Sequence, residues 1–167
     1  NGKMDLLREY STKYSYGFFY SVVTEALGWW VGDGEGTVMG LAPYGDLNVV
    51  PEAELAWLMP KFVEGDFKAP IDFGEIGATE YQDTYHWHFS ITDKITKVVD
   101  KYGKEAVAAR LQDMFEKEIL QFFTYWQKET ACTYCATAGG VFLNVKLNQK
   151  IIDSKMFEDY YIFSDAG

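Results

Sequence analysis

The sequence predicts an α/β fold in which a parallel or mixed sheet is flanked by helices. Its later part alternates a helix over residues 104–129, a strand over 134–138, a helix over 141–152 and a strand over 160–163. Helices that alternate with strands are typical of parallel or mixed sheets. A chain of 167 residues with 48% hydrophobic residues is sufficient for one core, so we expect a single domain or part of one.

The helices are predicted from the spacing of their apolar residues. Over residues 16–27 apolar side chains recur every three or four positions, and Gly28 follows where a helix end favours glycine. Residues 51–62 have the same spacing, with acidic residues in the first turn, where the helix dipole favours them. The widest apolar stripe lies in residues 104–129, so we expect a long and mostly buried helix there.

The segments between these helices are rich in glycine and aromatic residues. Glycine recurs through residues 32–45, which indicates a loop with unusual backbone conformations, and such a loop often approaches a ligand. The alternative is one helical turn over residues 37–42, docked through small side chains. Residues 65–89 contain aromatic and β-branched residues without a helical period, so we expect hairpin strands and loops.

Charge and hydropathy disfavour two classes of partner. A net charge of -10 with scattered basic residues would repel a phosphate backbone, so we expect no nucleic acid. No apolar run approaches the roughly twenty residues that span a bilayer, and the start lacks a signal peptide. We therefore expect a cytoplasmic protein without a membrane partner. Both ends look like cut points in a longer polypeptide. The aromatic surplus suggests a surface through which the free fragment would form a homodimer.

Two pairs of metal-binding residue types occur in the chain. Cys132 and Cys135 form a CxxC pair, and His86 and His88 form an HxH pair whose side chains would share one face of a strand. All four together could bind zinc. The alternatives are cysteines packed in the core and histidines in an ordinary packed strand. The sequence leaves these interpretations open.

A glycine pair, Gly139 and Gly140, stands between the predicted strand 134–138 and the next helix. Glycine lets backbone N–H groups approach a phosphate closely, and a following helix directs the positive end of its dipole at the same anion. The pair is therefore a candidate phosphate site, although tight turns also use glycine for packing.

Three strings in the sequence resemble the motifs of a known enzyme family. Residues 15–24 are SYGFFYSVVT, residues 35–45 are EGTVMGLAPYG, and residues 138–144 are AGGVFLN. In order and approximate spacing they resemble the O-carbamoyltransferases of the antibiotic-tailoring and nodulation-protein type. The resemblance implies an incomplete actin and sugar-kinase-like (ASKHA, ribonuclease H-like) domain. Residues 1–167 would be the later part of that N-terminal domain, with its earlier half and the C-terminal domain absent.

This resemblance implies ATP-dependent transfer of a carbamoyl group. ATP and carbamoyl phosphate would form a carbamoyl-adenylate, which passes the carbamoyl group to a hydroxyl of a sugar or antibiotic-like acceptor. The resemblance assigns these residues to the nucleotide site: Gly36 and Thr37 near the nucleoside, Gly139 and Gly140 at the phosphates, and Val141 and Asn144 beside them.

The resemblance also implies a metal site. Asp165, in the string SDAG, resembles the family's aspartate that joins two histidines from the absent half to hold a divalent metal. A carboxylate with two imidazoles suits an iron-type metal, and Mg²⁺ is the other candidate beside ATP. The alternative is a solvated loop aspartate.

Two departures from the family pattern keep other functions open. Thr37 stands where the family commonly has lysine, and the spacer before Asp165 is shortened. The alternatives are a non-catalytic nucleotide-sensing or interaction module and a threonylcarbamoyl-transfer relative. The fragment alone is expected to be inactive.

Overall fold

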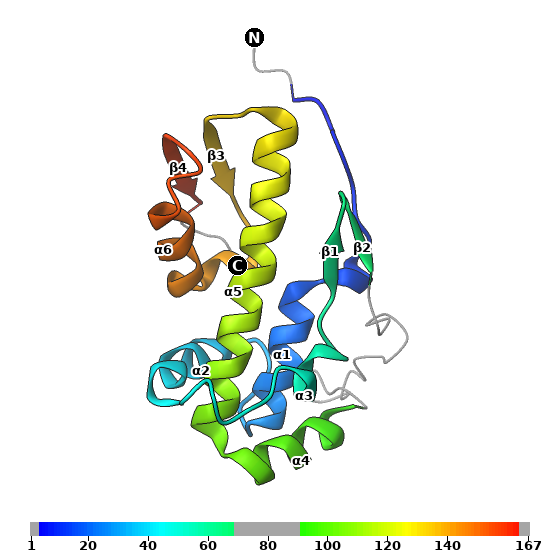
Figure 1. The fold of residues 1–167 in the computed structure, drawn as a ribbon, viewed down its shortest axis with the longest axis vertical. Helices are drawn as coiled ribbons and strands as arrows, with labels where there is room; N and C mark the ends of the chain where they lie inside the picture. Colours follow the sequence, from blue (N-terminus) through cyan, green and yellow to red (C-terminus); the bar gives the residue numbers. More distant parts are fainter. Residues whose placement is uncertain (1–3, 69–90, 164–167) are drawn as a thin grey trace.

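A long central helix organises the structure. The computed structural model describes residues 4–68 and 91–163, and within them α5 (Lys104–Thr130) runs through the middle of the molecule, with the other elements around it (Figure 1). The prediction of a long helix over 104–129 is confirmed. None of the helices in the described segments has the length and apolar character needed to cross a membrane.

The helix predicted over residues 16–27 is confirmed as α1 (Tyr16–Ala26), which follows the 3-10 turn η1 (Thr12–Tyr14). Ser15 caps α1, because its Oγ accepts a hydrogen bond from Phe18 N at 3.4 Å. After the helix, Gly28 has φ 91°, a value that glycine adopts at little cost.

The glycine-rich segment is mostly helical, so the loop prediction for residues 32–45 is wrong and its helical alternative is confirmed. The segment forms α2 (Glu35–Leu41) and the 3-10 turn η2 (Ala42–Tyr44). At its ends glycine serves close packing. A Cβ on Gly34 would overlap the Trp29 side chain, and one on Gly45 would lie 2.8 Å from the Ala109 Cβ.

The next helix, α3 (Ala53–Ala56), is shorter than the predicted 51–62. Pro60 follows and disfavours helical backbone at the residue before it, and Phe62 lies in a strand instead. The antiparallel hairpin of β1 (Lys61–Val63) and β2 (Asp66–Lys68) turns at Glu64 and Gly65, which both have positive φ. It confirms the start of the predicted hairpin region, and residues 69–89 of that prediction lie outside the described residues.

One helix was not predicted. α4 (Thr92–Tyr102) buries Ile95, Val98 and Val99 and ends at Gly103, which has φ 86°. The buried residues follow helical spacing, so the signal was present in the sequence.

The strands predicted near the end of the chain are confirmed as β3 (Tyr134–Thr137) and β4 (Asp159–Ile162), and they pair in parallel. Between them lie the 3-10 turn η3 (Gly140–Leu143) and α6 (Val145–Asp153), a helical crossover typical of α/β proteins. The α/β class is therefore confirmed. Within the described residues the strands form two separate pairs rather than one mixed sheet. The actin and sugar-kinase-like assignment stays a prediction.

The hydrophobic core lies between α5 and the helices around it. Its largest fully buried side chains come from most of the helices: Phe19, Leu27, Leu55, Leu58, Met59, Ile95, Leu111, Met114, Phe115 and Leu147. Burying one such side chain contributes about 1.5–3 kcal/mol. A second group of aromatic rings joins the hairpin to α5, where Phe62 meets Phe67 at 5.1 Å and Phe122 at 5.0 Å between ring centroids. Part of the aromatic surplus is therefore internal.

Candidate functional site

The three family-like strings converge on α1. The first contact joins α1 to the start of α2, where Ser21 Oγ donates a hydrogen bond to Glu35 Oε1 at 2.7 Å. The same carboxylate accepts from the backbone N–H of Gly32 at 3.0 Å. Glu35 thus holds the beginning of α2, with Gly36 and Thr37, against α1.

The second contact is a buried network between α1, α5 and the start of α6. Gln112 Oε1 accepts hydrogen bonds from Tyr20 Oη at 2.9 Å and from Asn144 Nδ2 at 3.0 Å. Gln112 Nε2 donates to Asn144 Oδ1 at 3.1 Å and to Glu116 Oε1 at 2.7 Å. All four residues are buried. Buried polar groups of this kind are stable only when paired, as they are here.

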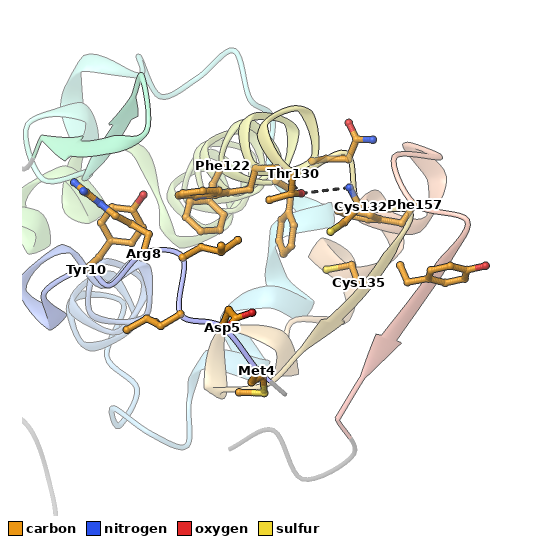
Figure 2. Close-up of a pocket in the computed structure, with 15 residues that line it drawn as sticks. Met4, Asp5, Arg8, Tyr10, Phe122, Thr130, Cys132, Cys135 and Phe157 are labelled. Carbon is orange, nitrogen blue, oxygen red and sulfur yellow. Dashed lines mark hydrogen bonds between the residues drawn. The ribbon is translucent and has the colours of Figure 1, made fainter. Parts of the chain in front are cut away.

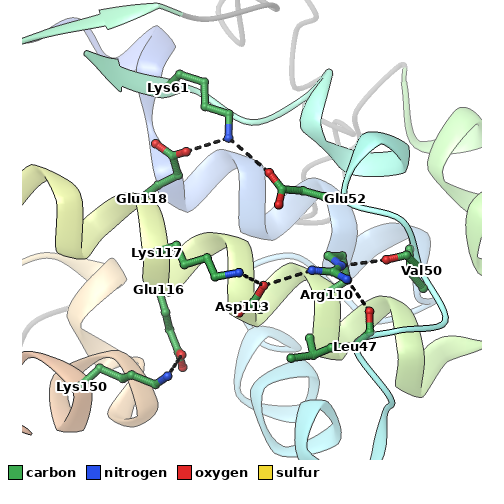
Figure 3. A network of polar contacts seen from close by, with 10 residues as sticks. All are labelled: Leu47, Val50, Glu52, Lys61, Arg110, Asp113, Glu116, Lys117, Glu118 and Lys150. Atoms are coloured by element: carbon green, nitrogen blue, oxygen red, sulfur yellow. Dashed lines mark hydrogen bonds and ion pairs between the residues drawn. The ribbon is translucent and has the colours of Figure 1, made fainter. Parts of the chain in front are cut away.

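Charged and ionisable groups surround this network. Lys150 Nζ on α6 lies 3.2 Å from Glu116 Oε2, so the buried carboxylate has a cationic partner (Figure 3). Burial raises the pKa of the Tyr20 phenol, and the charges of Glu116 and Glu35 raise it further. Tyr20 therefore stays protonated at neutral pH and keeps its role as a donor to Gln112.

The glycine turn follows β3 and is open on its outer side. Gly139 has φ 103°, a conformation that side-chain-bearing residues rarely adopt. Among residues 4–68 and 91–163, no heavy atom lies within 4 Å of a Cβ built on Gly139 or on Gly140, and both glycines are exposed. Packing against the described residues therefore does not require glycine at either position.

A second set of hydrogen bonds supports the turn from the sheet. Asn148 Nδ2 donates to the Phe142 carbonyl oxygen at 2.8 Å. Tyr160 Oη on β4 lies 3.3 Å from Asn148 Oδ1 and 2.9 Å from Thr137 Oγ1 on β3. η3 is thus anchored to both strands.

The helix after the glycine pair begins later than predicted. The prediction was one helix from residue 141, but η3 is a single 3-10 turn and α6 starts at Val145. The physical reason is the cap: Asn144 has extended backbone, and its Oδ1 accepts from Leu147 N at 3.0 Å. The dipole of α6 therefore begins at Asn144 and not directly behind Gly140.

The predicted nucleotide-site residues have different surroundings. Asn144 is buried and its amide is engaged within the protein, while Val141 is half-buried against α1, where a Cβ on Gly17 would lie 3.7 Å from its Cγ2. Gly36 and Thr37 are exposed on α2. The structure connects α2 to the glycine turn through α1. Whether these residues bind a nucleotide stays a prediction.

Sequence reasoning missed Gln112 and Glu116. Both lie in the apolar stripe predicted for residues 104–129, between buried residues such as Leu111 and Phe115. Two polar residues within such a stripe indicate a buried polar contact. The sequence could not show that the partners of Gln112 are Tyr20 and Asn144.

The predicted metal residues remain without a test. Asp165, His86 and His88 lie outside the described residues. Within residues 4–68 and 91–163, no group of three or more His, Cys, Asp or Glu side chains could hold a metal ion.

The two cysteines line an apolar cavity at the other end of β3. The cavity has a volume of about 490 Å³ and lies between the N-terminal segment, the end of α5 and β3 (Figure 2). Cys132 is exposed, so the core interpretation is wrong for it, whereas Cys135 is half-buried against the core. Burial, with a smaller effect of Cys132, raises the pKa of the Cys135 thiol.

A parallel strand pair joined by a glycine turn and a helix places the chain among α/β proteins. In proteins of this class, ligands commonly bind beyond the carboxyl ends of the strands. Comparison with known families narrows this class. The family model described as Carbamoyltransferase N-terminus matches residues 2–167. The chain therefore belongs to the carbamoyltransferase family and corresponds to its N-terminal part, which confirms the resemblance seen in the three strings.

Three curated relatives match most of the chain. The chain is 30% identical over 160 residues to the nodulation protein NolO of Bradyrhizobium diazoefficiens, a match that covers 92% of the chain and 26% of the relative. It is 28% identical over 161 residues to an uncharacterized protein of Methanocaldococcus jannaschii, covering 92% of the chain and 23% of the relative. An uncharacterized protein of Synechocystis is 26% identical over 168 residues, with 92% and 25% covered. The chain thus spans about a quarter of the length of these curated relatives.

Proposed function

We propose that the full-length protein transfers a carbamoyl group from carbamoyl phosphate, through a carbamoyl-adenylate, to a hydroxyl of a sugar or antibiotic-like acceptor, using ATP. In this proposal the chain supplies part of the nucleotide site and is inactive alone. The observation that carries it is the open glycine turn, Gly139–Gly140, between a parallel strand and its crossover helix.

The turn suits a phosphate group for two reasons. It follows β3, at the end where ligands of parallel sheets bind. Its glycines have no side chain to keep a phosphate away from the backbone N–H groups, and Gly139 holds a conformation that few other residues adopt. Gly36 and Thr37 on the exposed side of α2 would approach the nucleoside.

The proposed chemistry depends on positioning the substrates and does not require a nucleophilic side chain of the protein. A carbamoyl-adenylate is an activated mixed anhydride. Its formation would need hydrolysis of carbamoyl phosphate to carbamate and inorganic phosphate, after which a carbamate oxygen attacks the α-phosphorus of ATP and displaces pyrophosphate. The acceptor oxygen attacks its carbonyl carbon, the new C–O bond forms, and the bond to AMP breaks with its electron pair leaving on the phosphate. The acceptor proton passes to a base. A divalent metal, with Asp165 as its proposed ligand in this chain, would offset the charge of the polyphosphate.

One observation favours a second candidate, a nucleotide-sensing module without catalysis. Thr37 is exposed and uncharged where the family commonly has lysine, and Lys150 on α6 is already paired with Glu116. A site with fewer free cations stabilises a developing polyphosphate charge less well. A threonylcarbamoyl-transfer relative is disfavoured by the family match over residues 2–167.

The experiment is an assay of the full-length protein for pyrophosphate and AMP formation. We expect pyrophosphate only when ATP and carbamoyl phosphate are both present, and a loss of about 10-fold or more in Gly140→Val, equivalent to about 1.4 kcal/mol. ATP binding without pyrophosphate release would support the sensing module. A folded full-length protein that does not bind ATP would contradict both candidates.

A further inference from the structure

We propose that Gln112 is a positioning residue for the nucleotide site, acting through Asn144 on the glycine turn. This inference rests on the function proposed above. Gln112 lies on α5, 32 residues before Asn144, and would not touch the nucleotide itself. Its side chain instead fixes the residue at which η3 ends and α6 begins.

The two amides hold each other in one orientation. Asn144 Nδ2 donates to Gln112 Oε1 at 3.0 Å, and Gln112 Nε2 donates back to Asn144 Oδ1 at 3.1 Å. Tyr20 Oη and Glu116 Oε1 occupy the remaining acceptor and donor of Gln112, at 2.9 and 2.7 Å. Rotating either amide by half a turn would place donors against donors, so the network allows one arrangement.

The backbone carries this restraint from Asn144 to the turn. Asn144 N donates to the Val141 carbonyl oxygen at 3.2 Å, and Phe142 N donates to the Gly139 carbonyl oxygen at 2.9 Å. Because no described residue lies within 4 Å where side chains at Gly139 and Gly140 would project, the part of the chain that the structure describes does not hold the turn by packing on that side. Its position depends on the anchors at its end, of which the Gln112 and Asn144 pair is the more buried.

A purely structural role for Gln112 makes a different prediction. If Gln112 only contributes to the stability of α5, replacing it lowers the melting temperature and leaves the nucleotide affinity of the folded protein unchanged. If it positions the turn, affinity falls even far below the melting temperature. The effect must also depend on Asn144, because the restraint passes through that residue.

The test is a double-mutant cycle in the full-length protein, with the ATP Kd measured by calorimetry well below the melting temperature of each variant. We expect Gln112→Met to raise the Kd about 10-fold, which corresponds to about 1.4 kcal/mol. The double variant Gln112→Met/Asn144→Ala should bind within about 2-fold of Asn144→Ala alone, since residues that act as one unit are not additive.

Controls separate this proposal from the function on which it rests. Gln121→Met makes the same change on the same helix, where Gln121 Nε2 donates to the Phe62 carbonyl oxygen at 2.9 Å, and it should leave the Kd unchanged. If Gly140→Val abolishes ATP binding but Gln112→Met binds like the wild type, the positioning role is overturned and the nucleotide site stands. If Gly140→Val binds normally, the site itself is wrong.

Two further results decide the proposal. If the Kd of the double variant rises by the product of the two single effects, Gln112 and Asn144 act independently. That result would overturn the proposal. Should Gln112→Met fail to fold, the double variant Gln112→Glu/Glu116→Gln keeps the shape and the net charge of the pair but removes the hydrogen bond donated to Asn144 Oδ1. That variant should also raise the Kd about 10-fold at neutral pH, and a wild-type Kd would contradict the proposal.

Discussion

Gly45 lies directly against the backbone of α5, so that a Cβ on Gly45 would overlap the carbonyl oxygen of Glu105. This approach brings η2 onto the central helix and positions the whole EGTVMGLAPYG segment. Gly45 is therefore required for packing. The glycine content of this segment had instead indicated a loop that approaches a ligand.

Gly45→Ala should lower the free energy of unfolding by about 3 kcal/mol, since the added methyl group meets backbone that cannot move aside. Gly40→Ala is the matched control. Gly40 lies within α2 and no described residue lies within 4 Å of its Cβ position, so alanine there should stabilise by about 0.5–1 kcal/mol. Urea unfolding of both variants measures the difference, and equal effects would show that the close approach is incorrect.

Tyr16 and Tyr20 offer a second matched pair. Tyr20 Oη donates to Gln112, whereas Tyr16 Oη is buried without a hydrogen-bond partner in the part of the chain that the structure describes. Tyr20→Phe should cost about 1 kcal/mol, and Tyr16→Phe should be neutral or stabilising by about 1 kcal/mol. Thermal or urea unfolding checks this, and a destabilised Tyr16→Phe would imply a partner for that hydroxyl.

The same two phenols predict a loss of stability at high pH. Burial is the main cause that raises the pKa of both Tyr16 and Tyr20 above the ordinary value of 10.0, with nearby glutamates adding to it. In the unfolded chain these phenols ionise near pH 10, so stability that is present below this pH falls as the pH rises above it. Unfolding measured from pH 8 to 11 should show a shallower loss for Tyr16→Phe and Tyr20→Phe, and parallel curves would contradict the assignment.

A pair of charges joins the hairpin to α5. Lys61 Nζ lies 2.7 Å from Glu118 Oε1, and the Glu118 side chain is only 11% exposed (Figure 3). Lys61→Met should lower the free energy of unfolding by about 2 kcal/mol, less than for a fully buried pair because Lys61 is partly exposed. Lys117→Met is the control, because the Asp113 carboxylate retains its ion pair with Arg110 when Lys117 is lost. We expect the free energy of unfolding of this variant to change by less than about 0.5 kcal/mol. Equal losses in the two variants would contradict this ranking.

Local patterns predicted most of the helices and the parallel strands. The spacing of apolar residues indicated α1 and α5 nearly to their ends, and the alternation after residue 104 indicated the parallel pairing of β3 with β4. These features depend on periodicity within short windows, which a sequence displays directly. α4 has the same signal in Ile95, Val98 and Val99 and was overlooked.

The site was only partly predictable, because its contacts join distant residues. The open turn at Gly139 and Gly140 could be expected from its place between a strand and a helix. The network from Tyr20 to Gln112 spans 92 residues and follows no period. A glycine in the sequence does not reveal its structural role. Gly45 is needed for close packing, whereas Gly140 has no described residue near its Cβ position.

The most direct test of the proposed site is calorimetric titration of ATP into the full-length protein and its Gly140→Val variant. Gly140 has no described residue within 4 Å of its Cβ position and no positive φ, so valine should leave the fold intact while blocking the turn. Ala136→Val, on the exposed side of β3, is the control. We predict that the wild type and Ala136→Val bind ATP equally and that Gly140→Val does not bind. Wild-type affinity in a folded Gly140→Val variant would contradict a nucleotide site at the glycine turn.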